Sequence, residues 1–169
     1  MAATEPTAEL NPEFSSPDAK PTEWADASEI IVGAEIYWLA TVRPDGRPHV
    51  TPLISVFLDD AFFFCASASE RKARNLVTNP HVVLTTGTNV LAKGMDVVIE
   101  GIASRITDAA LLQRVADAYV VKYGLEWKFT PRDGLFHHED GNPAEVYAIT
   151  PVQGFGFGRG EFSQTRWVF

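Results

Sequence analysis

The stretch EIYWLATVRPDGRPHVTPLISVFLDDAFFFCAS (residues 35–67) decides the fold class. Its runs of β-branched and aromatic residues are interrupted at Pro44-Asp45-Gly46 and again at Asp59-Asp60. Both interruptions are strong turn signals between strands. The stretch therefore predicts three consecutive strands of an antiparallel meander.

The second of these strands contains two prolines, Pro48 and Pro52, which cannot donate ladder hydrogen bonds. This strand is therefore expected at a sheet edge or at a bulge. Along it, Val50 alternates with His49 and Thr51, and neither resulting face is purely polar. We therefore expect both faces of the strand to be covered.

The rest of the chain continues a mainly β pattern with few helices. A long loop is expected at residues 125–143, and no internal repeat of solenoid length occurs. Six or so strands with peripheral helices indicate a small antiparallel barrel rather than a βαβ sheet. Further strands are predicted at 81–87, 95–107, 144–150 and 152–158, and helices at 21–33, 70–79 and 108–123.

Length and composition indicate one domain preceded by a tail. The 169 residues suffice for a single domain, and no apolar run approaches the roughly 20 residues of a membrane span. Residues 1–20 carry three prolines without apolar periodicity, which predicts a disordered or extended tail before the domain at 21–169. The formal net charge of −8 argues against general nucleic-acid binding.

The single cysteine, Cys65, lies in an apolar run and cannot form an intramolecular disulfide. The N-terminus lacks the basic-then-apolar order of a signal peptide. These features predict a cytoplasmic protein with no membrane partner.

The stretch ASERKARNLVTNPHVV (68–83) places three cations within four positions, beginning with Arg71 and Lys72. If Ser69 caps a helix here, its first-turn N–H groups and these two cations converge, as they do in phosphate sites. The alternative is a solvated helix face on which Glu70 neutralises the third cation at i,i+4 spacing. Cations in a first helical turn oppose the helix dipole and need another reason to be there.

Other chemistry-bearing motifs carry less weight. The run GFGFGRG (154–160) has dinucleotide-like glycine spacing but precedes no predicted helix, and HHED (137–140) has no second cluster at metal-ligand spacing. We therefore expect no metal site and a solvated loop at 137–140. The aromatic end FSQTRWVF (162–169) is expected to dock, on its own barrel or across a subunit interface.

Three segments together resemble one family: YWLATVRPDGRPHVTPL (37–53), SERKARNLVTNPHVVL (69–84) and FSQTRWVF (162–169). They are similar to the pyridoxamine 5′-phosphate oxidase-like flavin and deazaflavin split-barrel proteins, and within them to the deazaflavin (coenzyme F420)-dependent oxidoreductases. The resemblance covers residues 21–169. It implies a homodimer of six-stranded antiparallel split β-barrels with Greek-key topology, with a cofactor in each of two grooves at the interface.

The resemblance also implies site residues. Arg71 and Lys72 would bind the cofactor phosphate, Asn75 would help to close that site, and Ala66 and Ser67 would border the phosphate and the ribityl chain. The remaining implied positions are Val50, Thr51 and Pro52, whose backbone would lie along the ring system, and Trp167, which would reach the groove. The chain lacks the arginine-rich C-terminal substrate segment of pyridoxamine phosphate oxidases, which argues against vitamin B6 oxidation.

The function that this resemblance implies is hydride transfer from reduced F420 to a small organic acceptor such as an activated alkene, a quinone or a tetrapyrrole. The cofactor would carry the chemistry, so no side-chain nucleophile is required. One alternative is an FMN-dependent oxidase or reductase, because the same Arg-Lys pair would hold either phosphate. The other is a non-catalytic flavin- or haem-binding protein, for which His49 is the candidate axial ligand.

Overall fold

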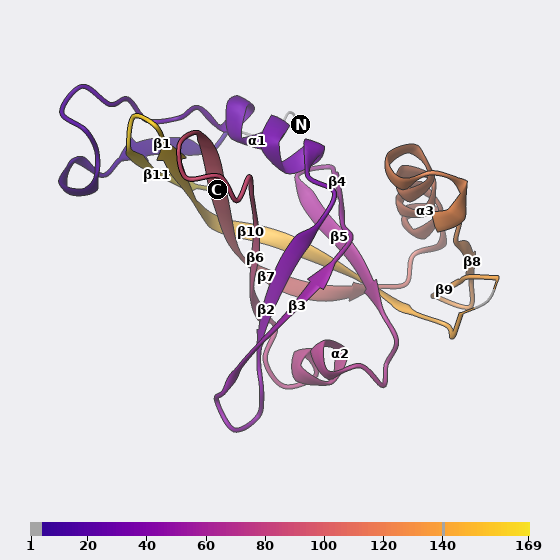
Figure 1. Cartoon of the computed structure of the whole chain (residues 1–169). Helices are drawn as coiled ribbons and strands as arrows, with labels where there is room; N and C mark the ends of the chain where they lie inside the picture. The colour runs from indigo at the N-terminus through magenta and orange to yellow at the C-terminus, as the bar shows by residue number, and fades with distance from the viewer. Residues whose placement is uncertain (1–4, 140) are drawn as a thin grey trace.

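The computed structural model describes residues 5–139 and 141–169, and these residues form a mainly β protein with few helices (Figure 1). The strands are β1 (Thr7–Leu10), β2 (Tyr37–Val42), β3 (Pro48–Leu53), β4 (Val56–Leu58), β5 (Ala61–Ala66), β6 (His81–Gly87), β7 (Gly94–Ile106), β8 (Thr130–Arg132), β9 (Leu135–His137), β10 (Glu145–Arg159) and β11 (Ser163–Val168). The helices are α1 (Trp24–Gly33), α2 (Arg71–Leu76) and α3 (Ala109–Tyr123), with short 3-10 turns η1 (Pro12–Phe14) and η2 (Leu125–Trp127).

The main sheet is antiparallel and branched. Its order is β1-β11-β10-β7-β6-β2-β3, and β5 also pairs with the first half of β10 and carries β4. The branch lies at an irregularity in β10 between Pro151 and Gln153, where the strand bends and changes partners. The mainly β, antiparallel prediction is confirmed, but within the described residues the sheet has nine strands rather than six and its path does not close.

The meander predicted from residues 35–67 is confirmed, with a short additional strand, β4. Its first turn is closed by hydrogen bonds from the Arg43 N–H to the Arg47 carbonyl and from the Gly46 N–H to the Arg43 carbonyl, with Gly46 at φ +83°. The second turn places Asp59 and Asp60 at φ +50° and +59°, a conformation that Asp tolerates better than most residues. As the prolines indicated, β3 is an edge strand that pairs only with β2 among the described strands.

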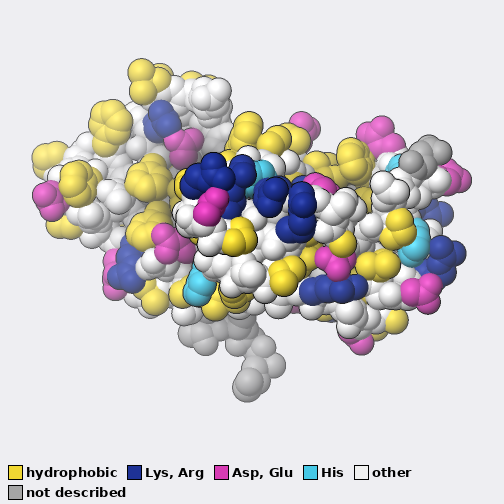
Figure 2. Space-filling model, turned by 90° about the horizontal axis from the view of Figure 1, so that it is seen from below, with side chains coloured by type: hydrophobic (Ala, Val, Ile, Leu, Met, Phe, Trp, Pro, Cys, Tyr) yellow, Lys and Arg dark blue, Asp and Glu magenta, His cyan; other side chains and the backbone are white. Residues whose placement is uncertain are grey.

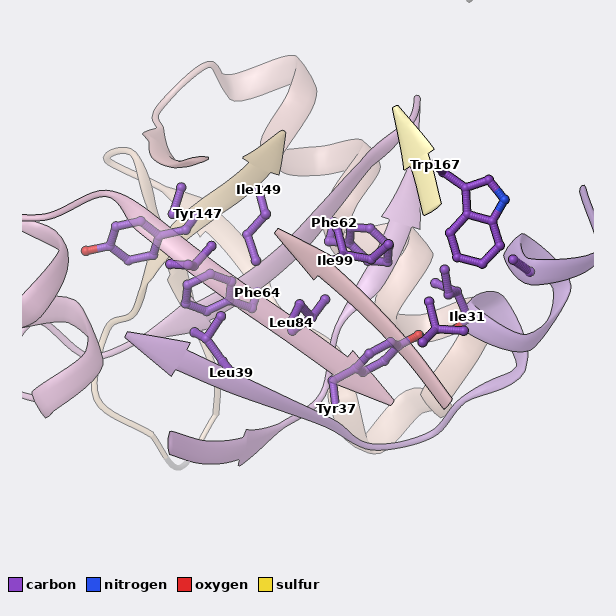
Figure 3. Close-up of a cluster of buried hydrophobic side chains, with 14 of the residues drawn as sticks. Ile31, Tyr37, Leu39, Phe62, Phe64, Leu84, Ile99, Tyr147, Ile149 and Trp167 are labelled. Atoms are coloured by element: carbon purple, nitrogen blue, oxygen red, sulfur yellow. The ribbon is translucent and has the colours of Figure 1, made fainter. Parts of the chain in front are cut away.

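The core lies on both faces of β5. Phe62 and Phe64 point into the larger cluster of buried side chains, which includes Leu39, Ile99 and Ile149 (Figure 3). Phe63, between them, points to the opposite face and packs under α3. A strand buried on both sides reads as a continuous apolar run rather than an alternating one. This explains the sequence AFFFCA of β5.

Glycines in β10 make room for a tryptophan on the neighbouring strand. Trp167 is fully buried, and a Cβ added to Gly156 would lie 2.4 Å from its Cη2 atom. Gly154 stands directly opposite Trp167 in the register. The GFGFG pattern is therefore a packing device, and the C-terminal segment docks on the sheet of its own chain.

One segment differs from the predictions, and another shows the extended alternative of its prediction. Residues 125–143, expected to form a long loop, contain the β8–β9 hairpin, whose Phe136 is fully buried beneath α3 beside Phe129. In the N-terminal segment, expected to be disordered or extended, Thr7–Leu10 forms β1, which pairs along the outer edge of β11. Residues 1–4 of that segment lie outside the described residues. No helix of the described chain is long and apolar enough to cross a membrane.

Candidate functional site

The short helix α2 is held against β2 by its buried face. Ala73 is 2% exposed, and Asn75 is fully buried with its Nδ2 donating to Thr41 Oγ1 at 2.9 Å. Thr41 in turn lies 3.5 Å from the carbonyl oxygen of His49 on β3. This chain of contacts fixes the helix relative to β2 and β3, and leaves its N-terminal end beside the end of β5.

At that end, Arg71 is exposed to solvent, whereas Lys72 is buried and 8% exposed. The Lys72 ammonium donates to the carboxylate of Glu70, whose other oxygen accepts the Ser67 N–H at 2.8 Å. The predicted cap is wrong: Glu70 rather than Ser69 occupies the N-cap position, and the Ser69 hydroxyl instead contacts Ser67 Oγ at 3.1 Å. Glu70 therefore pairs with Lys72 and not with the cation four residues on.

Three polar atoms near this helix are buried without a hydrogen-bond partner among the described residues: His49 Nδ1, Thr51 Oγ1 and Asn75 Oδ1. Buried polar atoms normally find partners, so unsatisfied ones call for an explanation. Their position beside Arg71 and Lys72 fits a site completed by a polar ligand.

The electrostatics of the site are cationic. Burial, followed by the charges of Arg43, Arg71 and Lys72, lowers the pKa of His49. Lys and Arg side chains gather on the underside of the molecule (Figure 2), the side on which α2 lies in Figure 1. An anion placed here would meet several positive charges at once.

The outer face of the sheet carries a mainly apolar groove of about 460 Å³. The groove begins at Thr41 and Pro48 and crosses β2, β6 and β7, and its wall includes Val83 and Ile102. Thr41 borders this groove and also bonds to Asn75 of α2, so one residue connects the groove with the cationic helix.

The structure brings most of the predicted site residues to this region. Ala66 ends β5 and is buried, Ser67 follows it, and Thr51 lies on the face of β3 that also carries His49. Val50 and Pro52 point to the opposite face of β3, where Val50 is 55% exposed. One face of β3 is therefore open in the single protomer, and the expectation that both faces are covered stays a prediction that requires a partner.

Trp167 lies apart from the other predicted site residues. Its indole is fully buried, packs edge-on against Trp24 at 5.5 Å between centroids, and donates from Nε1 to the Thr22 carbonyl at 2.8 Å. It stands on β11, far from α2 in Figure 1. In this protomer its side chain serves the core and does not reach the groove.

Sequence reasoning missed two participants: Thr41 and the pairing of Glu70 with Lys72. It named Arg43 only as a candidate for a further basic patch. The inward side chains of β2 are Tyr37, Leu39 and Thr41, and the first two belong to the core. A polar residue in this otherwise apolar series was the signal in the sequence that could have identified Thr41. Arg43 begins the turn that follows the same strand. Both lie next to α2 only because the sheet brings β2 under the helix.

Other candidate groups lie elsewhere. Burial raises the pKa of the Cys65 thiol to about 12, as expected for an inert strand cysteine. His137 Nδ1 lies 3.3 Å from the guanidinium of Arg132, and His138 Nε2 lies 2.9 Å from the carbonyl oxygen of Glu126. Among the described residues no group of His, Cys, Asp or Glu could hold a metal ion, and Asp140 of the same motif lies outside them.

A polar cluster also lies on the other side of the core, at the C-terminal end of α3. Lys122 Nζ donates to Tyr37 Oη at 2.8 Å and to the Ser55 carbonyl at 3.0 Å, and it lies 5.1 Å from the centroid of the Tyr123 ring. Burial lowers the pKa of Lys122 to about 8. The cluster ties α3 to β2 and is separate from the cations of α2.

These features define a mainly β protein with a branched antiparallel sheet and a cluster of cations at one end of α2. The chain belongs to the pyridoxamine 5′-phosphate oxidase family, whose sequence profile matches residues 24–155. A pyridoxine/pyridoxamine 5′-phosphate oxidase from Porphyromonas gingivalis is 35% identical over 69 residues, which are 40% of this chain and 29% of that protein. The match thus spans less than a third of the relative's length.

Solved structures share the fold at low identity. A FAD-binding protein from Mesorhizobium loti superposes with a TM-score of 0.60 at 16% identity, covering 97% of this chain and 99% of that one. The haem storage protein HutZ from Vibrio cholerae gives a TM-score of 0.63 at 24% identity, covering 81% and 94%. These likenesses establish the fold of this chain and do not identify its ligand.

Proposed function

We propose that the protein binds a phosphate-bearing flavin-type cofactor and uses it as an oxidoreductase. The observation that carries this proposal is the buried Lys72 beside the exposed Arg71, at the edge of an apolar groove and next to unsatisfied buried polar atoms. A buried ammonium is costly unless an anion accompanies it, and here that anion is the partly exposed carboxylate of Glu70, whose place a phosphate could take. A phosphate at the end of a flat ring system matches both halves of the site.

FMN is our first candidate for this cofactor. The curated match is named an oxidase of phosphorylated vitamin B6 compounds, and one protein of the same fold is named FAD-binding. F420, which the sequence resemblance suggested, is the second candidate because Arg43 adds a cation beyond the pair on α2. That charge suits the longer anionic tail of a deazaflavin.

When bound, the flavin or deazaflavin would supply hydride transfer to a small organic acceptor. Arg71 and Lys72 would hold the phosphate by charge-assisted hydrogen bonds. The apolar wall of the groove would exclude water from the ring. No nucleophilic side chain is needed, and the pKa of His49, lowered by burial and nearby cations, favours a neutral imidazole at the site.

We also propose that a second copy of the chain covers the outer face of the sheet. That face exposes a row of large apolar side chains, namely Trp38, Val50, Ile102, Val152 and Phe157. Contiguous apolar patches of this kind on a folded surface commonly mark an interface. The cofactor groove would then be closed by the partner.

Dimer formation is tested by placing a charge on this face away from α2. Ile102→Glu should convert a dimer to a monomer in sedimentation equilibrium, whereas the control Val121→Glu, at a position 87% exposed on α3, should leave the mass unchanged. A wild-type monomer at micromolar concentration would contradict the proposed interface.

Cofactor choice is tested by titrating the purified protein with FMN and with F420 in parallel. Trp38 is 51% exposed on the grooved face, so quenching of its fluorescence should report binding, and Trp38→Phe should remove that part of the signal. Tighter FMN binding supports the flavin proposal, and tighter F420 binding supports the deazaflavin one. Binding of neither rejects both.

The haem-binding alternative rests on His49 and on the likeness to a haem storage protein. His49 is half-buried in β3 with its Nδ1 covered. On this alternative, added haem should show a shifted Soret band with wild type and no shift with His49→Ala. Added FMN should leave the spectrum of bound haem unchanged. Unchanged haem spectra in that variant would exclude His49 as a ligand.

A further inference from the structure

The carboxylate of Glu70 occupies the position in which the phosphate is expected. One of its oxygens accepts the hydrogen bond of the Ser67 N–H at 2.8 Å, and the other accepts from the Lys72 ammonium. Both donors belong to the set that the proposed phosphate site would use. In the structure these donors are satisfied by an anion that the chain itself supplies.

The Glu70 side chain is also free to leave. Although it stands at the N-cap position of α2, it makes no capping hydrogen bond to the helix, and 44% of its side chain is exposed. Rotation toward solvent would therefore cost little burial. Lys72, by contrast, has a side chain only 10% exposed and cannot follow it into water.

Both carboxylate and phosphate cannot occupy the two donors together. A phosphate oxygen bound to Lys72 and Ser67 N–H would meet the charge of Glu70 at contact distance, and like charges in a partly desolvated site repel strongly. Binding of one anion thus requires displacement of the other. Meanwhile the internal pair keeps the buried ammonium compensated when no ligand is present.

We propose that Glu70 is an internal competitor that closes the phosphate site of the free protein and swings out when a phosphate-bearing ligand binds. This inference rests on the proposed phosphate site on α2. Only molecules in which the carboxylate has swung out can bind a phosphate. The apparent dissociation constant of every phosphorylated ligand therefore equals the intrinsic constant divided by the fraction of such molecules. A weakly bound or singly charged anion fails to displace it, so the device selects for a dianionic phosphate end.

The test is Glu70→Gln, which keeps the acceptor for Ser67 N–H but removes the negative charge. FMN should bind this variant roughly twofold to fivefold more tightly than wild type, the size expected for loss of a partly exposed ion pair. Riboflavin, which has the same ring and no phosphate, should bind both proteins equally. Asp59→Asn, at a carboxylate paired with Arg114 on the far side of the molecule, is the matched control and should change neither affinity.

Equal or weaker FMN binding by Glu70→Gln, in a variant that melts at the wild-type temperature, would overturn the inference and assign Glu70 to positioning Lys72. Glu70→Ala removes the contacts of Glu70 with both Ser67 and Lys72, and its FMN affinity should rise by at least as much.

If wild type binds neither FMN nor F420, the proposed function fails. The competitor role of Glu70 is then tested separately by titration with inorganic phosphate. Phosphate should bind Glu70→Gln more tightly than wild type, and equal binding would reject the competitor role.

Discussion

Replacement of Lys72 by methionine separates binding from stability at the candidate site. The ammonium is expected to make one charge-assisted hydrogen bond to the cofactor phosphate, and such bonds contribute about 1.5–3 kcal/mol. At about 1.4 kcal/mol per factor of ten, FMN affinity should fall roughly 10- to 150-fold. Riboflavin affinity should stay within about twofold, because the lost bond belongs to the phosphate alone.

The fold should survive this change. Methionine retains the buried stem, and Glu70, left without its cation, keeps the Ser67 N–H and has a side chain already 44% exposed. No fully buried charge is stranded, so unfolding free energy should change by about 1 kcal/mol or less. The matched control is Arg74→Met, at an exposed cation on the same helix.

The assay is fluorescence titration of wild type and both variants with FMN and riboflavin, with urea unfolding in parallel. A Lys72→Met protein that binds FMN as tightly as wild type would refute the phosphate role of α2. An equal loss of riboflavin affinity would show instead that the variant had distorted the groove.

Two further predictions concern the fold. Gly156→Ala would place a Cβ 2.4 Å from Trp167 Cη2 and 3.0 Å from the Met95 sulfur, so overpacking should lower the unfolding free energy by about 1–3 kcal/mol, measured by urea unfolding; an unchanged midpoint would refute this packing role. Lys122 has a pKa lowered by burial to about 8, below its value of about 10.4 in an unfolded chain, so the unfolded state binds more protons between these values. The stability of wild type relative to Lys122→Met should therefore rise by about 1–2 kcal/mol from pH 7.5 to 10.5, after allowance for partial exposure, and a constant difference would contradict the burial of this amine.

Local signals in the sequence were sufficient for the meander. The two turns and the edge position of β3 follow from Pro, Gly and Asp residues, whose backbone preferences act within a few residues. The strands that were missed take their stability from distant partners. Thr7–Leu10 has no apolar pattern of its own and becomes a strand only because the open edge of β11 accepts it.

The β8–β9 hairpin carried a usable signal that its surroundings obscured. Asp133-Gly134 is a hairpin turn sequence, and both residues adopt positive φ values of 56° and 72°. Three residues on either side are too few to show alternation, so the segment resembled a loop. Burial of Phe136 beneath α3, a tertiary contact, stabilises it.

At the candidate site, a shift of one residue in the helix start changed the interpretation of Glu70. With Ser69 as the cap, Glu70 would stand in the first turn facing Arg74; with Glu70 at the cap, its side chain turns back to Ser67 and Lys72. Helix boundaries are the least predictable feature of a sequence. The cations were therefore predictable from composition and spacing, whereas their partner was not.

The two faces of β3 divide the proposed function into separable parts. His49 and Thr51 lie on the half-buried face that also meets the cations of α2, while Val50 lies on the exposed apolar face that would meet a second copy of the chain. Because side chains on a strand alternate, one six-residue segment can contact a ligand's charged end and a partner's apolar surface at once. Changes on the first face should alter discrimination between FMN and riboflavin without altering mass. Changes on the second face should alter mass together with the affinity for both ligands, because the groove lies on that face. A change of mass caused by a substitution on the first face would contradict this division.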